Sequence, residues 1–389
     1  SEGLRVVAIH GPGDADRDPS QVNVALLGED LSFCASFEYT TDLGEDQKNA
    51  YLQVSLLHTS MSGRRTVRVM NLQLPLTSQL SSTFRHSDID TVCNLLCRKA
   101  VRKVYENVRD SSSQMKRMMS GVRDHLLSRV IKMLHAYRRY CATASSSGQL
   151  ILPEALKFLP LLTLALRKSV WLQSNEISIT PNIRADERAA SMSLLQSASP
   201  ALFMSTLYPY LFCLHEMKAE HGLPHKETPS GESRPDADDV FLPKPQYPSS
   251  EHLTEMGLLL LVNGLDFYFW VGRKVLRTTL QDLFNRTSLP NDEAKVQKIL
   301  FQKRDNMLSR RIFGVINAMK QRMRVDPSRI RLHVVKQMSG VRTAKERSTY
   351  SEDRFLSLLI EDKSRHGMSH VEMLCHVHKK IQLKMSDYD

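Results

Sequence analysis

Cysteine and histidine residues are the first side chains of this sequence whose spacing raises the question of metal binding. Cys93 and Cys97 lie four residues apart on a predicted helix, and Cys375, His376 and His378 lie together near the end of the chain. A structural metal site needs about four converging ligands, and these groups are smaller than that. We therefore expect buried thiols and surface histidines, and no metal site in this stretch of sequence.

Motifs for catalysis are also missing. The sequence has no P-loop, no G-x-S-x-G elbow and no H-E-x-x-H pair. His125 and His135 are ten residues apart on a predicted basic helix, which places them on different faces. We assign no catalytic residue and do not expect an enzyme.

The charge of the chain points to an anionic partner. The 389 residues include 53 Lys and Arg against 42 Asp and Glu, which gives a net charge of +11 and a pI near 9.3. Acidic lipid and nucleic acid both suit such a chain. The basic residues are spread out, without a compact nuclear-targeting run or interleaved aromatics. A membrane surface or acidic peptides are therefore expected, and nucleic acid is not.

The length and the cysteines define the class of protein. A chain of 389 residues is too long for one compact core, so two or three domains are expected. Six scattered cysteines without a secretory signal fit reduced thiols in the cytosol. No apolar run approaches the roughly 18 residues of a membrane span.

The pattern of apolar residues changes along the chain from strands to helices. Residues 51–57 and 66–76 read as two strands, and a change of apolar face in the second predicts a β-bulge or bend. Helical spacing begins at Ser87, and either Asp88 or Ser87 can cap the first helix. In residues 149–169, Pro160 predicts a break or kink between two apolar helical segments.

The last third predicts strands that alternate with helices. A loop or linker is expected at 217–250, and Asn263 with Gly264 predicts a hairpin turn. Further predicted elements are helices at 276–284, 292–323 and 371–384 and a strand at 331–335. The whole chain reads as multidomain α+β, and Trp171 and Trp270 are expected in the core.

Several motifs, in order, resemble one family of vesicle-coat proteins. Residues 53–69 with the following NLQLPL are similar to a family hairpin of the form QxxLLYTxxxGxRRIRV, and LPEALKFLPLLTLALRKS is similar to a helical signature. YPYLFCLHEM from Tyr208 and LIEDKSRHGMSHVEMLCHVHKKIQ near the end also match in order. Nearly the whole chain thus resembles the cargo-binding subunit of the inner COPII coat.

The resemblance implies three parts: the C-terminal part of a β-sandwich at 1–80, an all-α helical domain at 81–205 and a gelsolin-like α/β domain at 206–389. The family's zinc-finger and trunk domains lie N-terminal of the matched region, so the chain looks like a C-terminal fragment. Zinc is then expected only in the missing finger, with no cofactor here. The sister coat subunit is expected to contact the missing trunk.

The implied function is that of a non-enzymatic cargo adaptor. It would bind cytosolic export signals of cargo and SNARE proteins for ER-to-Golgi transport. Its place would be the cytoplasm, peripheral on the acidic cytosolic face of the endoplasmic reticulum and of COPII vesicles. The alternatives are the sister subunit, which stimulates the coat GTPase, and a gelsolin-like actin-binding protein.

The resemblance also implies residues that bind export signals. Arg68 matches a family arginine directly, Arg65 is displaced by one residue and could take part through a bulge, and Leu134 is a candidate pocket wall. Arginine suits acidic signals because its planar fork holds a carboxylate with two hydrogen bonds. The alternative is a solvated hairpin. At a second family site an aromatic residue aligns with Arg354, beside Phe355, which is expected in the core.

Overall fold

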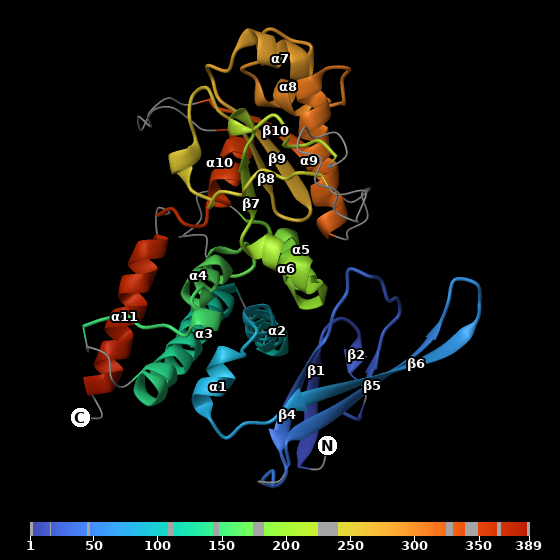
Figure 1. Cartoon of the computed structure of the whole chain (residues 1–389), viewed down its shortest axis with the longest axis vertical. Coiled ribbons are helices and arrows are strands. Elements are labelled where there is room, and N and C mark those ends of the chain that lie inside the picture. Colours follow the sequence, from blue (N-terminus) through green and yellow to red (C-terminus); the bar gives the residue numbers. More distant parts are fainter. Residues whose placement is uncertain are drawn as a thin grey trace.

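The computed structural model describes residues 3–15, 17–44, 47–107, 112–142, 148–173, 183–224, 240–323, 330–338, 349–363 and 367–386. Figure 1 shows three parts along the longest axis: strands β1 to β6 at one end, a group of helices in the middle, and a four-stranded sheet with its own helices at the other end. This arrangement agrees with the predicted multidomain α+β class. Residues 225–239 of the predicted linker lie outside the described residues.

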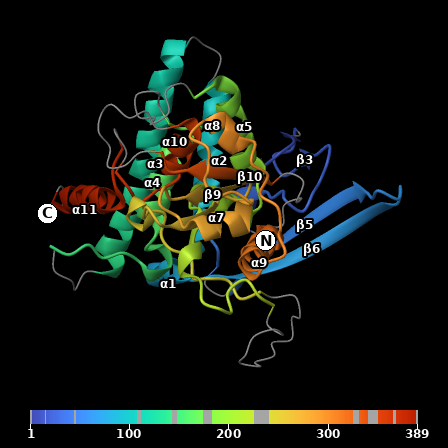
Figure 2. The same cartoon turned by 90° about the horizontal axis from the view of Figure 1, so that it is seen from above.

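Three antiparallel pairs make up the first part. They are β1 (Leu4–His10) with β4 (Cys34–Tyr39), β2 (Asp14–Ala15) with β3 (Val22–Asn23), and β5 (Asn49–Thr59) with β6 (Arg65–Pro75). The β5–β6 hairpin is the longest, and Figures 1 and 2 both show it projecting away from the helices.

The β5–β6 hairpin is regular, so the predicted β-bulge or bend in residues 66–76 is wrong. Pairing runs one-to-one from Asn49 opposite Pro75 to Thr59 opposite Arg65. The sequence pattern changes face because both faces of the strand carry apolar residues: Val67 and Val69 on one, and Met70 with its even-numbered neighbours on the other.

In the described residues of the middle part, the chain forms helices and one 3-10 turn. They are α1 (Leu80–Arg85), α2 (Ile89–Asn107), α3 (Ser112–Cys141), the 3-10 turn η1 (Glu154–Leu156), α4 (Leu159–Lys168), α5 (Ala185–Ser197) and α6 (Pro200–Leu207). The Asp88 carboxylate accepts a hydrogen bond from the Thr91 amide at 2.9 Å, which confirms the predicted cap. Pro160 lies in the first turn of α4, just after η1, so the predicted break is confirmed.

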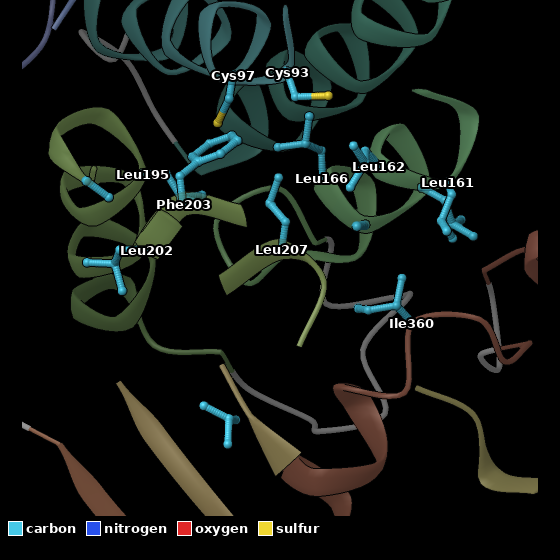
Figure 3. Packing of buried hydrophobic residues seen from close by; sticks show 14 of the residues in the cluster. Cys93, Cys97, Leu161, Leu162, Leu166, Leu195, Leu202, Phe203, Leu207 and Ile360 are labelled. Atoms are coloured by element: carbon cyan, nitrogen blue, oxygen red, sulfur yellow. The ribbon is translucent and has the colours of Figure 1, made fainter. Parts of the chain in front are cut away.

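The core of this part is built around α2 and α4. Figure 3 shows Cys93 and Cys97 of α2 pointing toward Phe203 of α6 and the leucines of α4, including Leu166. Trp171, directly after α4, is fully buried as predicted. The α4 part of the apolar segment at 149–169 therefore supplies core, and Leu159–Leu166 are all buried.

The third part is a four-stranded sheet in the order β10-β9-β8-β7. Its strands are β7 (Tyr210–Cys213), β8 (Leu258–Val262), β9 (Asp266–Val271) and β10 (Arg331–Lys336), and β10 runs parallel to β9. The turn between β8 and β9 contains Asn263 and Gly264 (φ 94°), as predicted. The Asn263 side chain accepts a hydrogen bond from the Asp266 amide at 2.8 Å and so closes the turn.

Helices cover both faces of this sheet. One face packs on α7 (Arg277–Phe284) and α9 (Met307–Met323), and the other on α10 (Tyr350–Ser357). Trp270 and Phe355 are both buried on the α10 side, with ring centroids 6.3 Å apart. Both residues are therefore core, as expected.

The single helix predicted at 292–323 is wrong, because the structure has two. These are α8 (Glu293–Gln297) and α9, and residues 298–306 between them are not helical. Phe301 leaves the helical path to pack between Phe269 and Phe313, with centroids 4.7 and 4.9 Å away. Asn306 then caps the start of α9, because its side-chain oxygen accepts a hydrogen bond from the Ser309 amide at 2.8 Å.

The last helix, α11 (His370–Ser386), returns to the middle part and packs on α3 and α4. Lys168 at the end of α4 also binds the segment that precedes α11. Its ammonium donates hydrogen bonds to the carbonyls of Ile360 and Asp362 at 2.7 and 2.5 Å. Burial lowers the pKa of Lys168 to about 8, although nearby acidic groups oppose the shift.

A buried arginine joins the strands to the helices. Arg98 of α2 has no exposed surface and donates to the carbonyls of His10, Ser32 and Ala198 at 2.9, 2.6 and 3.0 Å. A buried cation is tolerated only when such acceptors surround it. The position of β1 and β4 on α2 is therefore fixed by hydrogen bonds as well as by packing.

Candidate functional site

The tip of the β5–β6 hairpin places a cluster of arginines in solvent. Gly63 adopts a left-handed φ of 80°, and the Ser60 amide donates to the Arg64 carbonyl at 2.9 Å to close the turn. Arg65 then begins β6, and Arg68 follows three residues later on the same strand. Both side chains are exposed.

The structure does not bring Arg65 and Arg68 together. Arg65 lies opposite Thr59 and Arg68 opposite Leu56, in an unbroken antiparallel register. Because side chains alternate across a strand, two residues three positions apart point to opposite faces. Without a bulge, one carboxylate cannot contact both guanidinium groups.

Both faces of the hairpin place exposed apolar side chains near an arginine, and on the Arg65 face Leu57 and Val67 are 55% and 60% exposed. On the Arg68 face, Val54 and Met70 form a cross-strand pair and are 47% and 45% exposed. Within the described part of the chain, no hydrogen bond or ion pair holds the Arg68 guanidinium. The face can therefore offer a cation beside exposed apolar surface.

Leu134 lies elsewhere. It is on α3, is fully buried in the helical core, and belongs to the same cluster as Leu166. Figures 1 and 2 show the hairpin extending away from α3. In this structure Leu134 does not contribute to a surface shared with Arg68.

Arg354 belongs to a polar cluster on β9, β10 and α10. Its Nε donates to the Tyr268 hydroxyl at 3.3 Å, and the Tyr268 ring stacks on His333 at 5.0 Å. His333 and Arg331 both contact the Asp266 carboxylate at 3.0 Å. At the position where the family has an aromatic residue, this chain has one of several cations around a buried aspartate.

The charges in this cluster act on one another. Burial alone would raise the pKa of Asp266, but the hydrogen bond from His333 and the charge of Arg331 lower it overall. The pKa of Arg354 is raised despite burial, mainly through Tyr268. Asp266 is therefore held ionised, and it fixes the cations that reach the surface.

Sequence reasoning did not find this cluster. The sequence pattern places Arg331 and His333 in a strand and does not single out Asp266. They meet because β10 aligns with β9 in parallel, with Arg331 opposite Asp266. The signal was the position of both residues at the start of their strands, but it is informative only once the strand order is known.

The prediction of buried thiols is confirmed for Cys93 and Cys97 and is wrong for Cys375, which is exposed on α11. Cys93 and Cys97 are buried, and burial raises the pKa of Cys93 to about 12, with Asp90 and Asp88 adding to it. Within the described ranges, no group of three or more His, Cys, Asp or Glu side chains is placed to hold a metal ion. Among the same residues, no helix is both long and apolar enough to cross a membrane.

Comparison with known families places each part of the chain. Residues 1–77 match the Sec23/Sec24 beta-sandwich domain, residues 88–205 the Sec23/Sec24 helical domain, and residues 240–290 the Gelsolin repeat.

Relatives match along nearly the whole chain. Protein transport protein SEC24 B of Arabidopsis thaliana is 31% identical, and human Protein transport protein Sec24C is 30% identical; each match covers 99% of this chain and 31% of the relative. The crystal structure of the human COPII-coat protein Sec24c superposes with a TM-score of 0.76 at 29% identity, covering 99% of this chain and 43% of that one. The chain thus spans about a third of the length of these curated relatives.

The relatives are Sec24 proteins, so the comparison favours the cargo-binding subunit's family over that of its sister subunit. The relatives also agree with the prediction that the chain is not an enzyme. The strands, the helical core and the sheet described above correspond to the three matched domain families. The chain therefore belongs to the Sec24 family of COPII coat proteins and carries the β-sandwich, helical and gelsolin-repeat parts of that family.

Proposed function

We propose that this chain acts as a cargo adaptor of the COPII coat, and that the Arg68 face of the hairpin binds acidic export signals in the cytosolic tails of membrane proteins. The observation that carries the proposal is an exposed guanidinium beside exposed apolar side chains, at the arginine whose position matches the family hairpin directly. Arg68 lies between Thr66 and Met70 on that face, opposite Leu56.

The chemistry of the face defines the signal. A guanidinium holds a carboxylate through two parallel hydrogen bonds, and Val54 with Met70 can cover an apolar side chain two residues away on an extended peptide. A signal with an acidic residue next to a hydrophobic one fits both features. Because the face is exposed, we expect the arginine to contribute only about 1 to 2 kcal/mol.

Arg65 and Leu134 have different roles in this proposal. Arg65 faces the other side of the hairpin, so it serves no part of the Arg68 contact. Leu134 is buried in the helical core, and the apolar wall is assigned instead to Val54 and Met70.

The cluster around Arg354 is a second candidate surface for acidic segments. The Arg331 side chain is 68% exposed, and its Nε forms an ion pair with the buried Asp266 carboxylate at 3.0 Å. An acidic peptide would compete with Asp266 for this guanidinium, so binding here should be weaker than at Arg68.

The remaining partners follow from charge and from the family. The net charge of +11 favours approach to the acidic cytosolic face of the endoplasmic reticulum. The sister coat subunit is proposed to bind a part of the protein outside this sequence. The protein would then be peripheral on the membrane, in the cytoplasm, during ER-to-Golgi transport.

Peptide binding tests the proposal. Fluorescence anisotropy would follow a labelled acidic signal peptide with the native chain and with Arg68→Ala and Arg65→Ala variants. We expect the Arg68→Ala change to raise the Kd roughly 5- to 30-fold, which corresponds to about 1 to 2 kcal/mol.

Arg65→Ala is the matched control, because it removes the same charge from the same strand but on the other face. Its Kd should stay within about twofold of the native value. Equal losses in the two variants would reduce the effect to net charge and would contradict the assigned face.

A further inference from the structure

The turn that closes the β5–β6 hairpin presents a methionine to solvent. The Gly63 amide donates to the Ser60 carbonyl at 2.9 Å, and the Ser60 amide donates to the Arg64 carbonyl at the same distance. Met61 is the second residue of this tight turn, and its relative exposure is 105%. Short polar residues and glycine usually occupy such turns, so a fully exposed methionine singles out the tip as a surface for a partner.

Exposed apolar surface continues from Met61 along the face of the hairpin that carries Arg65. Leu57 and Val67 form a cross-strand pair on this face, and more than half of each side chain is exposed. At about 3.3 Å per residue, the pair lies roughly 7 Å behind Arg65 along the strands. The tip therefore combines apolar side chains with a cation among them.

The ionised side chains of the hairpin are all cations. Residues 49–75 contain three arginines and no Asp or Glu. Arg64 and Arg65 directly follow the turn, and both are exposed. Two of the three charges thus lie next to Met61, where they favour an anionic partner.

The position of the tip in the molecule makes it accessible to a flat surface. Figures 1 and 2 view the chain from directions at right angles, and in both the hairpin extends past the other described elements on its side. A membrane that approaches from this side would reach the turn first.

An acidic lipid surface matches this combination of features better than an acidic protein segment does. Guanidinium groups bind phosphate and carboxylate groups, and exposed apolar side chains gain by entering the boundary between headgroups and acyl chains. An acidic segment would satisfy Arg64 and Arg65 but would leave Met61 in water. A lipid surface receives all three side chains.

We propose that the hairpin tip inserts into the headgroup region of an acidic membrane, with Met61 entering first and with Arg64 and Arg65 bound to lipid phosphates and carboxylates. The face that carries Arg65 then lies toward the lipid. The Arg68 face points away from the lipid, where an export signal can reach it. The inference rests on the proposed approach to an acidic membrane and does not depend on the Arg68 contact with export signals.

Tryptophan fluorescence of the full chain on vesicles tests the insertion. Met61→Trp places a reporter at the tip, and Met70→Trp places one on the Arg68 face. Trp171 and Trp270 are buried and supply a constant background. Vesicles of phosphatidylcholine alone are compared with vesicles of equal parts phosphatidylcholine and phosphatidylserine. We expect a blue shift of Met61→Trp on the acidic vesicles only, and none for Met70→Trp.

Vesicle sedimentation with three further variants locates the contact. Arg65→Gln should lower the partition onto acidic vesicles by about fivefold, because a cation near such a surface contributes a factor of this size. Met61→Ser should lower it by about threefold or more. Lys48→Gln removes the same charge at the opposite end of the hairpin, beyond a Debye length from the tip, and should change the partition by less than about twofold.

The possible results separate this inference from the proposed membrane approach. Equal losses in Arg65→Gln and Lys48→Gln, or partition without a blue shift of Met61→Trp, would place the membrane contact elsewhere and leave the tip to a protein partner. Equal blue shifts at both tryptophan positions would contradict the assigned face. Each of these results overturns the inference but not the approach to the membrane, whereas no partition of the native chain onto acidic vesicles would contradict both.

Discussion

At the scale of single residues, the decisive feature of the hairpin is which face an arginine occupies. Arg65 and Arg68 are three positions apart, and the regular register puts them on opposite faces. The sequence predicted both as candidates, because the family motif carries several arginines. The sequence alone could not exclude a bulge. Because both faces of the strand carry apolar residues, the usual alternation of apolar and polar residues is not visible.

Buried residues were more predictable at this scale. Trp171, Trp270 and Phe355 were expected in the core from their apolar neighbours, and all three are at most 1% exposed. Leu134 shows the limit of such reasoning. Its place in a family motif predicted a pocket wall, whereas its place on the apolar stripe of α3 is what determines its burial.

Asp266 gives a prediction about pH. Its pKa is lower in the folded chain than its ordinary value of 3.8. The carboxylate therefore stabilises the fold at pH values above its unfolded pKa, and this contribution is lost as the pH falls through the lower folded value. Asp266→Asn should cost about 1 to 2 kcal/mol at neutral pH, and the difference should fade as the pH falls below the ordinary pKa of 3.8 and through the lowered pKa of the folded chain.

Urea unfolding of the native chain and the variant across this pH range measures the effect. The groups facing Asp266 are Arg331, His333, Arg354 and Tyr268, and none of them is a carboxylate. A stability difference that stays constant down to low pH would show that Asp266 does not act through its charge.

At the scale of elements, local caps and turns were predictable, but element lengths depended on tertiary contacts. Asp88 and the turn at Gly264 follow local chemistry and were confirmed. The long helix predicted at 292–323 is interrupted because Phe301 gains more from packing on Phe269 and Phe313 than from continuing the helix. The cluster that receives Phe301 forms only after β9 and α9 have met, so helical periodicity alone could not reveal it.

Asn306 should control where α9 begins. Its side-chain oxygen accepts from the Ser309 amide, and its nitrogen donates to the Asp282 carbonyl at 2.8 Å. Asn306→Ala should lower the free energy of unfolding by about 1 kcal/mol. Asn306→Asp keeps the cap and loses only the second bond, so its loss should be smaller.

Thermal unfolding followed by circular dichroism compares these two variants. Equal losses would assign the stabilisation to the bond with Asp282 instead of the cap. No loss in either variant would mean that packing of Phe301 alone positions α9.

At the scale of the whole molecule, the three parts are tied together by buried polar contacts. Arg98 binds the strands to the helices, and Lys168 binds the helices to the segment that follows α10. The order of the three parts was predicted from the sequence through its ordered motifs. The return of α11 onto α3 and α4 was not, because nothing in its amphipathic pattern says which surface it covers.

Arg98 offers a test of this connection. Arg98→Met keeps most of the side-chain volume but removes the guanidinium that donates to the carbonyls of His10 and Ser32, while the Ala198 carbonyl keeps its hydrogen bond from the Ser32 hydroxyl. We expect a loss of about 3 kcal/mol in the free energy of unfolding, since several buried acceptors lose their partner at once. Lys99→Met, on the exposed side of the same helix, should change stability by less than about 0.5 kcal/mol.

Hydrogen exchange locates the effect. Arg98→Met should increase exchange in β1 and β4 more than in the β7–β10 sheet, because only the former lie beside the lost contacts. A uniform increase over all three parts, or a loss of stability no greater than that of Lys99→Met, would contradict the role given to Arg98.

The central claim concerns the partner of Arg68, and a double-mutant cycle tests it most directly. The cycle combines Arg68→Ala with replacement of the acidic residue of the signal peptide by its amide, and repeats the measurement with Arg65→Ala. We predict a coupling energy of about 1 kcal/mol or more between Arg68 and the peptide carboxylate, and close to zero for Arg65. A coupling near zero for Arg68, or an equal coupling for both arginines, would contradict the proposed site.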